Sequence, residues 1–481
     1  MSVRVFVVGG MVLALLLGGG ARAPSAQAQS QVDLAAARSY AQSLSDNYWE
    51  QAWVRHLEST ADGDGSIDWR YGARQQLSEL TDRYQRAIEE ADGFWVHLQV
   101  QDYLQRQLLA VQPHPMMPGR PGAFRLRVMS TTTPNALALN DGTILITTGL
   151  LTTLETKAQL RALVAHEVAH VVLDHALTSY RSSQKRSRAR KLLGTIIGGV
   201  TSVVTPGLGG GDAALESTVY GLSSDLATRY LDREFIASAG LEYSREQEAA
   251  ANRLAQGWLL AAGEPPAALY TALRALRRDS RTVSASHGAS FVDSHPGTDA
   301  LRATLGDVLA EHDTDPSVLD APAPAPDSSY DTPLAAVLEH EAEMDLAARR
   351  FYAAGEVLDR ALRTDWTTAR TFLFKAIAVR NTTTGPDGVA EALRLLDAAE
   401  RTAERPEPRI EAERALLRVR TGDAARARHH LARCRAQIDD LRAAATPADT
   451  LAVAHDSLYA WAAKMEARLR TAGADGEALR N

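Results

Sequence analysis

Apolar residues recur at helical spacing along most of this chain, and one short region alternates instead. Between Arg74 and Ala91 the apolar positions lie three or four residues apart, within a region from 30 to about 118 that reads as helical. A break rich in Pro and Gly follows at 113–122. Three strand-like stretches come next, and Asn140-Asp141-Gly142 is a strong hairpin signal between the last two; the stretches are residues 124–128, 135–139 and 143–147.

The C-terminal part of the chain changes character twice. Residues 311–333 are rich in Pro, Ala and Asp, which predicts a linker that is semi-stiff where Ala and Pro alternate. The pattern from residue 334 to the end is helical. Three glycines, each expected to precede a helix, are spaced by the period of about 34 residues that is typical of tetratricopeptide repeats; they are Gly355, Gly388 and Gly422. The small residues expected where paired helices meet are Ala361, Ala392 and Ala427. A plain helical bundle is the alternative.

The first residues read as a targeting segment. Arg4 precedes an apolar stretch, 5–17, that is short for a membrane span. Ala26-Gln27-Ala28 then fits a small-x-small cleavage pattern. This predicts a signal peptide of residues 1–28 and a mature chain that is periplasmic or secreted and has no transmembrane helix. An uncleaved anchor is the alternative.

Composition narrows the classes further. The chain has 481 residues, of which 45% are hydrophobic and 23% charged, as in ordinary globular proteins. Its net charge of −7 argues against nucleic acid as a partner. The lone cysteine, Cys434, excludes an internal disulfide.

Residues 192–220 are apolar and then Gly-rich, and we expect them to form a flap over a cleft.

Candidate chemistry is concentrated in the sequence His166-Glu167-Val168-Ala169-His170, an HExxH motif. On a helix, residues four apart share a face, so His166 and His170 can bind one metal ion. Glu167 is then placed to accept a proton from water at that ion. The pattern predicts a site for one Zn²⁺ per chain, whereas a buried helix without chemistry is the alternative.

Catalytic zinc needs a third protein ligand. A histidine six residues after His170 would supply it in one class of zinc peptidases, but position 176 is Ala. His175 falls one residue short and would face elsewhere on a continued helix, so we expect a structural role for it. The remaining source is a later helix near residue 248, where Glu242, Glu246 and Glu248 lie close together in the sequence.

The segments around these residues resemble metallopeptidase family 48, the gluzincins related to HtpX and the CAAX prenyl protease. The resemblance covers roughly residues 118 to 305. The chain is more similar to the soluble periplasmic branch of the family, which carries C-terminal tetratricopeptide repeats. It rests on motifs in the family's order: Asn135-Ala136-Leu137 with Gly142, Thr147-Thr148-Gly149-Leu150-Leu151, the HExxH motif, Ser244-Arg245 with Glu248 and Ala251, and Ser294-His295-Pro296 with Arg302. The family's register implies that Glu248 is the third zinc ligand.

Two further residues matter in this light. The family has Asp where this chain has Asn252, four residues after Glu248 and on the same helix face. We expect the Asn252 amide oxygen to accept a hydrogen bond from a zinc-binding imidazole, without adding charge, so that the site is weakened or tuned. His295 is the candidate for stabilising the oxyanion, or for a fourth zinc position in a latent state; a loop histidine without a role is the alternative.

Together these patterns predict a mainly α fold with a small β-sheet, an α+β zincin-type domain followed by an α-helical repeat domain. The expected divisions are a signal peptide (1–28), an N-terminal helical region (29–117), a zinc metallopeptidase domain (118–310), a linker (311–333) and the repeats (334–481). The expected function is an exported zinc endopeptidase that cleaves misfolded or unassembled envelope proteins. Its repeats would recruit polypeptide substrates or an envelope-protein assembly partner. The alternative is a latent or weakly active chaperone or scaffold that acts through its repeats.

Overall fold

The computed structural model describes residues 69–111, 124–184, 243–278, 298–444 apart from 323, and 451–471. The predicted signal peptide, the 192–220 segment and His295 lie outside these ranges. The described part of the chain up to residue 311, here called the sheet-containing region, contains α2 (Trp69–Glu90), β1 (Phe94–Trp95), α3 (Leu98–Val111), β2 (Arg125–Met129), β3 (Ala136–Ala138), β4 (Thr143–Thr147), α4 (Thr148–Thr153), α5 (Lys157–Val172), α6 (His175–Gln184), α9 (Arg245–Ala261), α10 (Ala268–Arg278) and α13 (Thr298–Glu311). Mainly helical structure with one small sheet confirms the predicted fold class.

The four strands form one mixed sheet in the order β1-β2-β4-β3. β2 and β4 are parallel, whereas β1 pairs antiparallel with β2 and β3 antiparallel with β4. The predicted hairpin joins β3 to β4: the Leu139 amide donates to the Thr143 carbonyl at 2.8 Å, and Gly142 takes a φ of +87° that favours glycine. Among the described strands, β3 therefore lies at an edge of this sheet.

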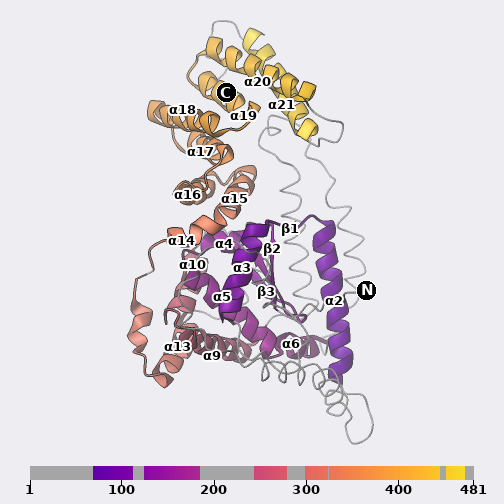
Figure 1. Ribbon diagram of the computed structural model, residues 1–481, viewed down its shortest axis with the longest axis vertical. Coiled ribbons are helices and arrows are strands. Elements are labelled where there is room, and N and C mark those ends of the chain that lie inside the picture. Colours follow the sequence, from indigo (N-terminus) through magenta and orange to yellow (C-terminus); the bar gives the residue numbers. More distant parts are fainter. Residues whose placement is uncertain are drawn as a thin grey trace, which may run out of the picture. The chain divides into compact units, whose positions relative to one another are not determined.

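Alternation along the strands gives the sheet two covered faces. Leu126, Ile144 and Ala138 point to the face that packs on α3 and α5. Leu137 and Leu145 point to the other face, which packs on α2 and α6. Figure 1 shows α2 on the side of the strands opposite α3 and α5. The N-terminal helical region thus supplies, through α2, one of the two layers around the sheet.

Helix α5 lies at the centre of the sheet-containing region. It begins at Thr156, whose side chain accepts from the Gln159 amide while Gln159 bonds back, a capping box. Almost every residue from Gln159 to Val171 is buried, because α5 packs against α3, α9 and α10 as well as the sheet. The helix ends at Val172, and Asp174 adopts a left-handed φ of 55° before α6 begins.

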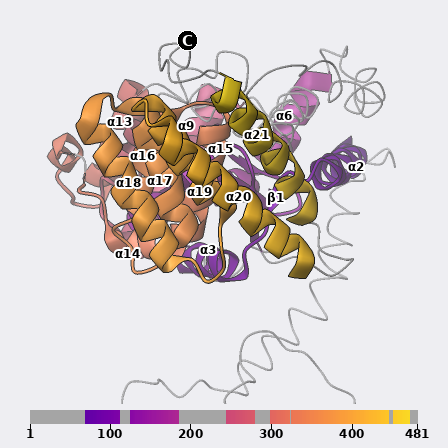
Figure 2. The ribbon, with the colours of Figure 1, turned by 90° about the horizontal axis from the view of Figure 1, so that it is seen from above.

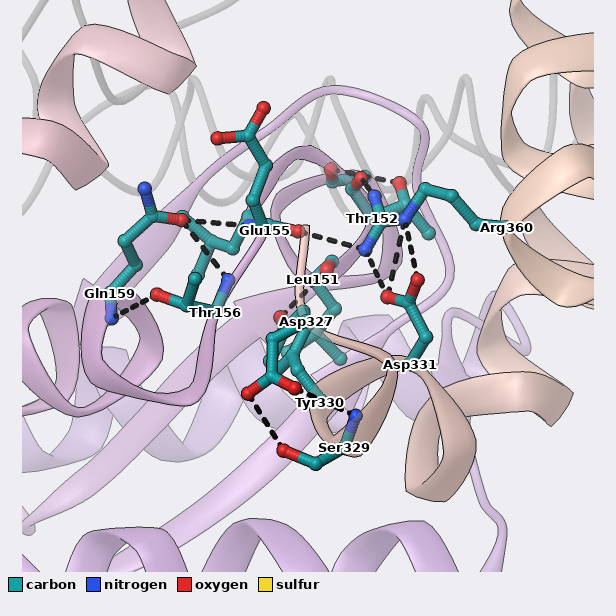
Figure 3. A network of polar contacts seen from close by, with 12 residues as sticks. Leu151, Thr152, Glu155, Thr156, Gln159, Asp327, Ser329, Tyr330, Asp331 and Arg360 are labelled. Carbon is teal, nitrogen blue, oxygen red and sulfur yellow. Dashed lines mark hydrogen bonds and ion pairs between the residues drawn. The ribbon is translucent and has the colours of Figure 1, made fainter. Parts of the chain in front are cut away.

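The interval predicted as a linker carries short helices on both sides of its Ala-Pro alternation: η3 (Pro316–Asp320), α14 (Ser328–Asp331) and η4 (Thr332–Leu334). The residues around α14 pack against α4 and its connection to α5 (Figure 3). Tyr330, which is fully buried, donates its hydroxyl to the Leu151 carbonyl at 2.8 Å. The sheet-containing region and the C-terminal helices therefore meet directly at this point.

The remaining helices are α15 (Ala335–Ala347), α16 (Phe351–Ala361), α17 (Ala369–Thr382), α18 (Gly385–Thr402), α19 (Pro408–Arg420), α20 (Ala424–Ala444) and α21 (Leu451–Thr471). Each packs on the next in chain order, and Figures 1 and 2 show the resulting stack. The alanines expected where helices meet are buried: Ala361, Ala392 and Ala427. Whether these hairpins are tetratricopeptide repeats stays a prediction.

The glycines were expected to precede helices, and this was wrong for two of them. Gly355 lies within α16, which begins at Phe351. Gly388 lies within α18, which begins at Gly385. A side chain at Gly388 would overlap the side chain of Thr383, so this glycine permits close packing. Gly422, in contrast, has a φ of +77° in the turn between α19 and α20, as expected of a glycine before a helix.

Within the described ranges, none of the helices combines the length and the apolarity needed to cross a bilayer.

Candidate metal centre

Helix α5 directs two histidines to one position. His166 and His170 lie one helical turn apart, so their side chains leave the same face. Their Nε2 atoms are 3.0 Å apart, and each residue is only 1% exposed. The helix predicted for the HExxH motif is confirmed, and it brings both imidazoles together as the spacing requires.

Glu248 reaches the same position from α9. Ser244 caps this helix and forms a capping box with Gln247, which fixes the first turn that carries Glu248. The Glu248 carboxylate oxygens lie 3.6 Å from His166 Nε2 and 3.6 Å from His170 Nε2. Glu246 is exposed and Glu248 is buried, so the structure distinguishes these two carboxylates, whereas Glu242 lies outside the described residues.

The three residues fit a zinc ion. A tetrahedral zinc site places neighbouring nitrogen and oxygen ligands roughly 3.3–3.6 Å apart, from metal distances of about 2.0–2.2 Å. The observed separations of 3.0, 3.6 and 3.6 Å lie at or near this range. Within the described part of the chain, this is the one group of at least three His, Cys, Asp or Glu side chains placed to share an ion.

Glu167 is buried beside this group and faces β3. Burial raises the pKa of Glu167 to about 8, and a hydrogen bond from the Ala138 backbone works in the opposite direction. Burial also raises the pKa of Glu248 to about 9, with repulsion from Glu167 as a second cause. Two carboxyl groups in a dry site need a cation if both are to ionise near neutral pH, which is what a divalent metal provides.

Asn252 does not make the bond expected of it. The residue is 1% exposed, and neither its amide oxygen nor its amide nitrogen has a hydrogen-bond partner among the described residues. Asn252 lies about one helical turn beyond Glu248 on α9, yet neither of its amide atoms is within hydrogen-bond distance of His166 or His170. The predicted contact with a metal-binding histidine was wrong.

His175 contacts the site, contrary to the expectation that it would face elsewhere. Its Nδ1 lies 3.1 Å from His170 Nδ1. On a continued helix, residue 175 would lie about 140° around the axis from residue 170. The helix ends instead at Val172, and the left-handed Asp174 turns the chain so that the His175 ring returns to His170. Burial lowers the pKa of His175 to about 4, which leaves the ring neutral at pH 7.

Tyr243 also contacts the site, although sequence reasoning gave it no role. Its ring stacks on His170, with centroids 4.1 Å apart and planes 25° apart. Tyr243 also lines a small recess beside His170, together with Leu139 after β3 and Leu77 of α2. No spacing rule points to Tyr243 or His175; the one local hint for His175 is Asp174, a residue type that tolerates a left-handed turn.

Comparison with known proteins agrees with this geometry. Residues 98–303 match the profile described as Peptidase family M48, whose members are zinc-dependent. No curated protein matches the chain. The matched segment runs from α3 into α13 and includes His166, His170 and Glu248, whereas α2 and the C-terminal helices lie outside it. Over this segment the chain resembles peptidase family M48, and the resemblance supports a metallopeptidase activity.

Proposed function

We propose that the protein is a zinc endopeptidase whose metal is held by His166, His170 and Glu248. The observation that carries the proposal is the burial of these three side chains around one position, with Glu167 beside them and an edge strand of the sheet next to Glu167. Zinc in that position would supply a Lewis acid and lower the pKa of water toward neutrality.

Glu167 serves as general base and then as general acid. Its carboxylate takes a proton from the attacking water and delivers the proton to the leaving amine nitrogen. An efficient proton carrier has a pKa near the working pH. Burial moves the pKa of Glu167 upward to about 8, and a neighbouring cation would move it down again. The balance keeps the group able to both accept and release a proton.

The substrate backbone is proposed to lie along β3 as an added strand. The Leu139 amide and the Asn135 carbonyl bond to β4, so the alternate residues, Ala136 and Ala138, direct their backbone groups away from β4. Ala138 is also the residue whose backbone contacts Glu167. Recognition through backbone groups gives loose sequence selectivity, which suits unfolded chains.

Misfolded or unassembled envelope proteins are the proposed substrates, and the periplasm or the cell exterior the proposed location. The signal-like segment at 1–28 supports export. The stack of helical hairpins from α15 to α20 supports a second surface that recruits substrate or an assembly partner. His295 is proposed as an oxyanion-stabilising residue on the strength of its motif.

Cleavage of casein by the mature chain tests this function. We expect chelator-sensitive cleavage that Glu167→Gln abolishes while zinc stays bound. Glu248→Gln should lose zinc, and Glu246→Gln on the same helical turn should behave as wild type, because Glu246 is exposed. Residual cleavage by Glu167→Gln would refute its role as base.

One observation favours a second function, a latent peptidase that acts as a chaperone or scaffold. Asn252 places a neutral amide without a partner among the described residues next to the third ligand, where the family has a carboxylate. Stoichiometric zinc without casein cleavage, and suppression of aggregation that survives Glu167→Gln, would support this function over the first.

A further inference from the structure

Both ring nitrogens of His170 are engaged. Its Nε2 faces His166 Nε2 at 3.0 Å and the Glu248 carboxylate at 3.6 Å. Its Nδ1 faces His175 Nδ1 at 3.1 Å, with the two rings nearly perpendicular at 74°. The first contact points to the metal position and the second points away from it.

This geometry determines where the protons lie when a metal is held. A nitrogen that binds metal carries no hydrogen, so a neutral His170 that binds through Nε2 must carry its hydrogen on Nδ1. The Nδ1–H of His170 then donates to His175 Nδ1, and His175 carries its own hydrogen on Nε2. Metal-binding histidines commonly donate their second N–H to an oxygen acceptor that fixes tautomer and orientation. Here an imidazole nitrogen takes that place.

The turn that carries His175 is held by the helix of the third ligand. Gln247, the residue before Glu248, donates from Nε2 to the His175 carbonyl at 3.3 Å and to Thr178 Oγ1 at 2.9 Å. Ser179 Oγ donates to Gln247 Oε1 at 3.2 Å. One chain of hydrogen bonds thus runs from the first turn of α9 to the first turn of α6 and on to His170.

Asn252 does not compete for this role, since neither of its amide atoms has a partner among the described residues. We propose that His175 is the positioning residue of the metal centre, which accepts the Nδ1–H of His170 and holds its Nε2 toward the metal in place of a carboxylate. The inference rests on the proposed zinc function.

Zinc affinity of the full mature chain, measured by competition with a chromophoric chelator, tests the proposal through two variants. His175→Phe keeps an aromatic ring but removes the acceptor. His175→Asn loses the ring but keeps an acceptor, because the Asn amide oxygen is bonded to Cγ as Nδ1 is in His. We expect affinity to fall about 10- to 100-fold for Phe and to recover most of that loss for Asn. His340→Asn, which removes another mostly buried histidine that bonds to Ser130, is the matched control and should leave affinity unchanged.

A merely structural role predicts the reverse order, since Phe preserves the packed ring better than Asn. Equal zinc affinities for wild type and His175→Phe, or a loss of affinity that His175→Asn does not recover, would overturn this inference and leave the proposed function standing. A wild-type chain that fails to bind zinc would overturn the proposed function together with it. Long-range ¹⁵N NMR spectra of the zinc-loaded wild type provide a test independent of any variant: we expect a hydrogen on His170 Nδ1 and on His175 Nε2. A hydrogen on His175 Nδ1 would contradict the proposal.

Discussion

The Arg360 guanidinium joins α16 to α4 and to the connection between α4 and α5. Replacing Arg360 should lower the free energy of unfolding far more than the loss of an ordinary surface ion pair. Arg360 Nη2 lies 2.6 Å from Asp331 Oδ1 and donates to the Leu154 carbonyl at 2.8 Å (Figure 3). Nη1 also donates to the Thr152 carbonyl. Asp331 is 2% exposed, and the Arg360 side chain is 13% exposed.

The magnitude follows from this burial. Arg360→Met leaves the Asp331 carboxylate without its cation in a site that water reaches poorly. Breaking a buried ion pair by removing one partner costs about 3–5 kcal/mol, because a buried charge is left uncompensated. Arg394 pairs with Glu391 on the surface of α18, with 69% and 45% of the side chains exposed. Arg394→Met should therefore cost below about 1 kcal/mol.

Urea unfolding of the full mature chain, followed by circular dichroism and tryptophan fluorescence, measures the difference. We expect the double variant Arg360→Met with Asp331→Asn to recover part of the loss, because the uncompensated charge is then gone. If Arg360→Met and Arg394→Met destabilise equally, the reasoning from buried charge is refuted. If the double variant is no better than Arg360→Met, the loss comes from the carbonyl contacts.

Three further perturbations have distinct expected outcomes. Gly149→Ala forces a methyl group into a backbone carbonyl and should destabilise by about 1–3 kcal/mol, whereas Gly257→Ala in α9 has open space and should stabilise by about 0.5–1 kcal/mol; thermal melts that rank them the other way would contradict the packing. Burial, with a smaller contribution from a neighbouring arginine, lowers the pKa of His340 to about 4. Between about pH 6.5 and 4, the unfolded chain therefore binds a proton at this residue that the folded chain does not bind. Stability from this group is lost as pH falls from about 6.5 to 4, by roughly 2–4 kcal/mol, and His340→Asn should flatten that part of the unfolding profile; an unchanged slope would refute it. Zinc binding at pH 7 should release about one to two protons, because without a cation the pKa values of Glu167 and Glu248 are about 8 and 9; calorimetric enthalpies that do not depend on the buffer would contradict this.

The sequence alone was sufficient where the physics is local. Four-residue spacing places His166 and His170 on one helix face whatever the rest of the chain does. Alternation and the Asn140-Asp141-Gly142 turn likewise predicted strands close to β2, β3 and β4, with limits shifted by a residue or so. Glu248 was reached through a resemblance in motif order, since nothing within a few residues of it signals a metal.

Tertiary structure decided the contacts between segments distant in the chain. Glu248 meets His170 because α9 packs on α5. Arg360 bonds to a carbonyl 208 residues away, and no periodicity encodes that pairing. His175 failed as a prediction for a different reason: its direction depends on where α5 stops, and one left-handed residue, Asp174, turns the ring back to His170. Residue spacing predicts which side chains share a helix face, whereas helix ends and packing determine which of them meet.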